Sequence, residues 1–160
     1  MNRYVLLFLL LMIAVPQLVK HFATPEQEWT RFMPGYAQFD DQGRDGRADF
    51  QDAIRDASDN GKQVMMILGG HWCHWCRSLN STFNENPELA RKLAARYVVL
   101  HMYVGDGGRN DEFLTRLPRA PGVPWIYVFD GQGRLVRQID SNEMVGNSGS
   151  YDPQRIEAVL

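Results

Sequence analysis

The 160-residue sequence contains two cysteines, three positions apart, in the run Cys73-His74-Trp75-Cys76. A structural disulfide stabilises a protein mainly by closing a long loop, because its benefit comes largely from restricting the unfolded chain. A loop with only two residues between the sulfurs restricts very little. The spacing therefore favours reversible redox chemistry, in which the pair forms and breaks its disulfide, over a purely structural bond.

The neighbouring residues suggest a role for each sulfur. At the start of a helix Cys73 would lie near unpaired backbone N–H groups, whose partial positive charge favours the thiolate. We therefore expect Cys73 to attack a partner's disulfide and the more buried Cys76 to resolve the mixed disulfide. His74 either stabilises the thiolate when protonated or points to solvent. Trp72 and Trp75 either form an apolar rim that a partner covers or pack on the fold.

Apolar patterns predict the elements that position this pair. Residues 48–60 have helical spacing and end at Asn60-Gly61. The continuous apolar run 64–68 is typical of a central strand buried on both faces, and the cysteines follow it directly.

After the cysteines the sequence continues to alternate between helix and strand patterns. Asn86 and Pro87 are predicted to cap and open a helix, and Met144 is expected in a loop. The remaining predictions are helices over 76–83, 111–117 and from 152, and strands over 97–104, 125–129 and 135–139. This order predicts an α/β fold with a central mixed sheet, parallel at its centre with an antiparallel hairpin at one edge, and helices on both faces.

The first 23 residues have the pattern of a secretory signal peptide or an N-terminal membrane anchor. Arg3 precedes an apolar run over residues 4–15, which is shorter than the roughly 20 residues that a spanning helix needs. We therefore expect a periplasmic or otherwise extracytoplasmic protein, either cleaved or anchored in the membrane. Residues 24–47 form an aromatic-containing extension that is expected to pack on the domain of residues 48–160. A net charge of −2 offers no basic surface for nucleic acid.

The run Trp72-Cys73-His74-Trp75-Cys76 after an apolar strand, followed some fifty residues later by Gly122-Val123-Pro124, resembles the thioredoxin-like superfamily. It is most similar to exported thiol-disulfide oxidoreductases, such as the terminal domain of periplasmic thiol-disulfide interchange proteins. The resemblance implies exchange with protein thiols and disulfides without a cofactor, and electrons from a membrane-embedded donor. It also implies that Pro124 is cis beside the cysteines and that Val123 offers its backbone to a partner chain.

Two positions depart from thioredoxin. A buried acid there assists proton transfer from the resolving thiol, but Ile67 occupies that position here, and His101 falls near the place of the acid's lysine partner. Another group or water must then take the proton. The His-Trp pair between the cysteines also implies a different redox poise from that of thioredoxin.

Two other functions remain as alternatives. A copper- or zinc-binding thioredoxin fold could use His71, Cys73, His74 and Cys76, although closed zinc sites usually draw ligands from two separate segments. A non-catalytic interaction module could bind partners through the aromatic extension. Covalent haem attachment is excluded, because Arg77 stands where a histidine would be required.

Overall fold

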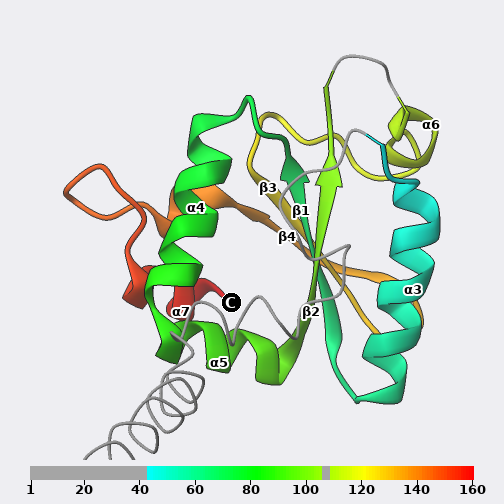
Figure 1. Ribbon diagram of the computed structural model, residues 1–160, viewed down its shortest axis with the longest axis horizontal. Coiled ribbons are helices and arrows are strands. Elements are labelled where there is room, and N and C mark those ends of the chain that lie inside the picture. The colour runs from blue at the N-terminus through cyan, green and yellow to red at the C-terminus, as the bar shows by residue number, and fades with distance from the viewer. Residues whose placement is uncertain (1–42, 106–108) are drawn as a thin grey trace, which may run out of the picture.

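The computed structural model describes residues 43–105 and 109–160 (Figure 1). The predicted leader and residues 24–42 of the extension lie outside these ranges. A four-stranded sheet with the order β2-β1-β3-β4 forms the centre of the described part. Its strands are β1 (Gln63–Gly69), β2 (Tyr97–Tyr103), β3 (Trp125–Phe129) and β4 (Leu135–Asp140). β1 is parallel to β2 and antiparallel to β3, and β4 pairs antiparallel with β3, which confirms the predicted mixed sheet.

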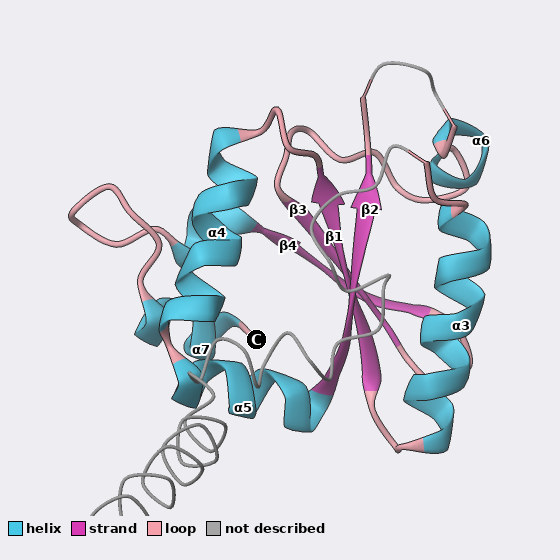
Figure 2. Ribbon diagram, viewed as in Figure 1, coloured by secondary structure: helices cyan, strands magenta, loops and turns pink. Residues whose placement is uncertain are grey.

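Helices cover both faces of this sheet, as the sequence predicts (Figure 2). On one side lie α3 (Gly46–Asp59) and α6 (Asp111–Leu114), and on the other lie α4 (His74–Glu85), α5 (Pro87–Arg96) and α7 (Pro153–Val159). Since β1 has helices above and below it, its side chains meet apolar neighbours on both faces. Residues 64–68 are accordingly at most 4% exposed, and the continuous apolar run is explained by this double burial.

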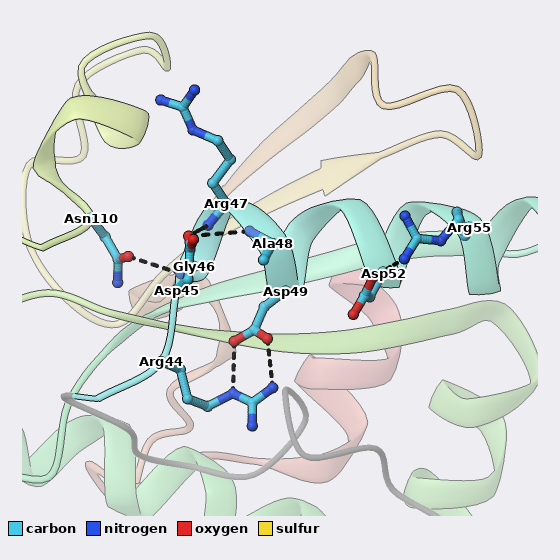
Figure 3. Close-up of polar contacts among 9 residues, drawn as sticks. All are labelled: Arg44, Asp45, Gly46, Arg47, Ala48, Asp49, Asp52, Arg55 and Asn110. Carbon is cyan, nitrogen blue, oxygen red and sulfur yellow. Dashed lines mark hydrogen bonds and ion pairs between the residues drawn. The ribbon is translucent and has the colours of Figure 1, made fainter.

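Helix α3 begins at Gly46, two residues earlier than the apolar periodicity indicates (Figure 3). Asp45 caps it by accepting hydrogen bonds from the backbone N–H groups of Arg47 and Ala48. Such a cap satisfies N–H groups that have no partner inside the helix. In the first turn Asp49 is buried and forms a two-pronged ion pair with Arg44.

Asn110 connects the start of α3 to the end of β2. Its Oδ1 accepts a hydrogen bond from Gly46 N at 3.0 Å, and its Nδ2 donates one to Tyr103 O at 3.0 Å. Gly46 is required here, because a Cβ would lie 2.3 Å from the sulfur of Met102. These contacts hold Asn110 and the end of β2 against the start of α3.

Asn86 is the N-cap residue of α5 and Pro87 opens this helix, as predicted. The Asn86 side chain makes no capping bond, because its Nδ2 donates to Thr82 O at 2.7 Å and closes the preceding helix. One local prediction is wrong. Met144 is not in a loop: it ends a 3-10 helix, η2 (Ser141–Met144), and is fully buried. The single turn after β4 directs this side chain into the core, although its neighbours in sequence are polar.

Candidate active site

The cysteine pair lies where α4 starts, beyond the carboxyl ends of β1 and β2. Figure 1 shows both arrowheads pointing to the edge of the sheet above which α4 begins. The chain leaves β1 at Gly69 and turns through a hydrogen bond from Cys73 N to Gly70 O. The buried strand and this turn together set the position of Cys73.

Cys73 and Cys76 form a disulfide, with their Cα atoms 5.3 Å apart. Cys73 is the N-cap residue of α4, and its Sγ accepts a hydrogen bond from Cys76 N at 3.1 Å. Cys73 is 6% exposed and Cys76 is 1% exposed, which confirms that Cys76 is the more buried of the two. The first sulfur thus lies at the positive end of the helix, in a residue that is slightly more exposed than Cys76.

Two exposed tryptophans flank the disulfide. Trp72 is 57% exposed, and its indole N–H donates to Val104 O at 2.9 Å. Trp75 is 45% exposed and meets the ring of Tyr151 edge-on, with centroids 5.9 Å apart. The ring of His74 is exposed and lies 6.0 Å from that of Trp75. Each indole thus makes a contact within the fold and is otherwise open to solvent.

The Val123–Pro124 peptide bond is cis, in agreement with the sequence expectation. The carbonyl of Pro124 accepts a hydrogen bond from the Ser141 hydroxyl at 2.7 Å, and the Tyr151 hydroxyl donates to that of Ser141 at 3.3 Å. Burial raises the pKa of Tyr151, so the phenol stays protonated and acts as the donor. These bonds connect the loop of Gly122, Val123 and Pro124, which we call the proline loop, to Ser141 and Tyr151. Tyr151 is also the residue whose ring contacts Trp75.

Sequence reasoning missed Ser141 and Tyr151. They lie 17 residues or more beyond Pro124 in a polar stretch with no motif, and only the fold brings them to it. Asp140 and Ser141, directly after the predicted strand, were a weak signal for a turn at this point, since such residues often end a strand by starting a turn.

Two cavities flank the proline loop, and both are lined by Gly122 and Val123. The larger, of about 590 Å³, lies toward α6 and is largely apolar; Leu68 and Tyr127 form part of its wall. The smaller, of about 180 Å³, is lined by Trp75, Pro124 and residues that follow β4. Three predicted site residues, Trp75, Val123 and Pro124, therefore meet at one place. Trp72, before Cys73, and His74, the first residue of α4, line neither cavity.

The position of thioredoxin's buried acid is apolar here. Ile67 is 1% exposed in β1 and lies beside His101 of β2 in the strand register. Burial lowers the pKa of His101 to about 4, so its imidazole is neutral at pH 7. Neither residue supplies a carboxylate for proton transfer.

Within residues 43–105 and 109–160, no three His, Cys, Asp or Glu side chains are grouped so that they could hold a metal ion. His71 and His74 therefore do not join the cysteines in such a group. In the same ranges, none of the helices combines the length and the apolar character needed to cross a bilayer.

A family model described as thioredoxin-like matches residues 45–131, more than half of the sequence. The chain belongs to the thioredoxin-like family. Its cysteine spacing, its disulfide and the position of the pair at the start of α4 agree with this membership.

Solved structures support the same fold. A disulphide isomerase from Xylella fastidiosa Temecula1 matches with a TM-score of 0.64 and 22% sequence identity, over 74% of this chain and 91% of that one. A thioredoxin from Thermus thermophilus matches with a TM-score of 0.51 and 24% identity, over 68% of this chain and 78% of that one. With family membership and a disulfide-bonded C-x-x-C pair, this thioredoxin-like protein is a thiol-disulfide oxidoreductase that acts on protein thiols.

Proposed function

We propose that the protein exchanges thiols and disulfides with exported proteins, as a reductase or interchange protein, with Cys73 as the attacking sulfur and Cys76 as the resolving one. The observation that carries this assignment is the difference between the two sulfurs. Cys73 caps α4 and is 6% exposed, while Cys76 is 1% exposed and lies one turn further along. A thiolate at the capping position is stabilised by the backbone N–H groups of the first turn.

The exchange proceeds in two steps. The Cys73 thiolate attacks one sulfur of a partner's disulfide, the partner's S–S bond breaks, and the second partner sulfur leaves as a thiolate that takes up a proton. Cys76 then loses its proton and attacks the Cys73 sulfur of the mixed disulfide, which releases the second partner thiol. The partner gains two electrons and two protons, and the protein is left with the Cys73–Cys76 disulfide.

The surface around the pair is suited to holding the partner's chain. Trp72, His74 and Trp75, next to the cysteines in the sequence, are exposed and give a largely aromatic rim. The backbone N–H and C=O of Val123, which lines the same cavity as Trp75, are proposed to pair with an extended segment of the partner. Main-chain pairing of this kind needs no particular partner sequence, so it is suited to proteins of varied sequence.

The proposed compartment rests on the first 23 residues, where a basic start precedes an apolar run. Outside the cytoplasm a reductase needs a source of electrons. We propose a dithiol on a membrane-embedded protein, which would reduce the Cys73–Cys76 disulfide by the reverse of the steps above and be oxidised to a disulfide in turn. A leader retained as an anchor would keep the two proteins close together.

The test is a trapping experiment in the exported fraction of the producing cell. Cys76→Ser leaves the attacking thiol and removes the resolving one, so mixed disulfides should accumulate on Cys73. Cys73→Ser is the matched control and should trap few partners, and the double variant should trap none. Mass spectrometry of the trapped species would identify the partners. Trapping by Cys73→Ser in place of Cys76→Ser would reverse the assignment, and trapping by neither would refute the proposed exchange.

A further inference from the structure

The smaller cavity beside the proline loop has a wall of aromatic rings and one carboxylate. We call it the aromatic pocket; its rings belong to Trp75, Trp125 and Tyr151, and its carboxylate to Asp140. The cavity has a volume of about 180 Å³ and opens next to Val123, where a partner chain would pair. A side chain of that partner near its reactive cysteine would therefore lie close to the pocket.

Backbone structure sets how these groups face the pocket. The register of β3 and β4 places Asp140 opposite Trp125. The Oδ1 atom of Asp140 accepts a hydrogen bond from Asn142 N at 2.9 Å, which fixes the carboxylate at the start of η2. Tyr151 stands perpendicular to Trp75, with an interplanar angle of 89°. The rings and the carboxylate are thus positioned by elements that are already ordered without a partner.

Among the residues that line the pocket, Asp140 is the one with a charged side chain. Residues 140–152, which run from the end of β4 through η2 to the cap of α7, contain Asp140, Glu143 and Asp152 and have no lysine, arginine or histidine. The carboxylate of Asp152 accepts hydrogen bonds from two backbone N–H groups of α7 and so remains in place. A side chain that enters the pocket therefore meets one carboxylate and no cation among the residues that line it.

We propose that the aromatic pocket binds a lysine or arginine side chain of the partner protein, close to the cysteine that is exchanged. The inference rests on the proposed function, because it concerns the partner of the same dithiol. Aromatic faces attract a cation through the negative potential of the ring, and a carboxylate adds a direct charge. An acidic side chain would meet repulsion in the same place, and an uncharged aliphatic one would gain neither contribution.

The experiment compares synthetic peptides that differ in one residue near the cysteine. Disulfide-linked peptide homodimers are prepared with lysine, norleucine or glutamate at that residue. Each peptide, in excess over the reduced full-length protein, oxidises the protein, and tryptophan fluorescence records the rate. We expect the second-order rate constant for the lysine peptide to exceed that for norleucine about five- to tenfold, which corresponds to about 1–1.4 kcal/mol for an exposed cation–π contact and a surface ion pair together. The glutamate peptide should be the slowest.

Asp140→Asn keeps the hydrogen-bond acceptor for Asn142 N and removes the charge. It should lower the ratio of the lysine rate to the norleucine rate at least threefold. The matched control is Asp130→Asn, which makes the same change of charge in the β3–β4 turn, where Asp130 pairs with Arg134. It should keep the wild-type ratio. In the wild-type protein, added salt should also reduce the preference for lysine.

Equal rates for the three peptides, or an unchanged ratio in Asp140→Asn, would overturn the inference and leave the proposed exchange standing. A preference that both variants lose equally would assign it to overall charge and not to the pocket, and would also overturn the inference. If no peptide oxidises the reduced protein, the proposed function fails as well.

Discussion

His101 should make the stability of the protein depend on pH in the weakly acidic range. Its Nδ1 is buried, and burial lowers the pKa of the imidazole to about 4, against 6.5 for an unperturbed histidine. Between these values the unfolded chain binds a proton that the folded protein does not. The folded state therefore has its full stability above about pH 6.5 and loses it as the pH falls toward 4.

The size of the effect follows from the two pKa values. If the pKa of His101 is about 4 in the folded protein and 6.5 in the unfolded chain, about 2 kcal/mol of unfolding free energy is lost between pH 7 and pH 5. His101 is partly exposed as a residue, so solvent screening reduces this value. We expect a loss of about 1–2 kcal/mol from this one group.

Urea unfolding of the oxidised protein at pH 7 and pH 5 measures this loss. In His101→Gln the group no longer titrates, so the loss of unfolding free energy between the two pH values should shrink by about 1–2 kcal/mol. His74→Gln changes an exposed histidine and should keep the wild-type dependence. If His101→Gln shows the same loss as the wild type, the imidazole is not held neutral by burial and the reasoning is wrong.

Two further substitutions test how the site is supported. Asn110→Ala removes the bonds to Gly46 N and Tyr103 O and should lower the unfolding free energy by about 2 kcal/mol in a denaturant titration; a loss below about 0.5 kcal/mol would show that the bridge contributes little. Gly70→Ala would place a Cβ 2.6 Å from the indole nitrogen of Trp72, so this ring should move, with a changed tryptophan emission spectrum and a loss of about 1–2 kcal/mol. An unchanged spectrum would mean that the loop accommodates the methyl group without moving the tryptophan.

The sheet could be predicted because its signals are local. The apolar run of β1 lies between glycines, and the hairpin of β3 and β4 is marked by the glycine-rich turn after Phe129. Both strands of that hairpin lie within one residue of the predicted ranges. The cysteine pair was equally local, since spacing and the preceding strand sufficed to place it at the start of a helix.

Contacts between distant segments could not be read in the same way. Asn110 bonds to Gly46 across 64 positions, and Ser141 bonds to the carbonyl of Pro124 across 17. Neither contact leaves a periodic pattern, because each depends on how the sheet brings two loops together. Met144 was misplaced for a related reason: one turn of 3-10 helix buries a single side chain, and one apolar residue among polar ones is not a pattern.

The central claim is that Cys73 and Cys76 form a dithiol that cycles with its disulfide, and a redox titration tests it most directly. The full-length protein is equilibrated in glutathione buffers of graded potential, quenched in acid and alkylated, and the fraction of disulfide is counted by mass. The account predicts one two-electron transition, in which the ratio of oxidised to reduced protein changes about tenfold per 30 mV. A pair that stays oxidised, or stays reduced, across the whole range of buffers would contradict it.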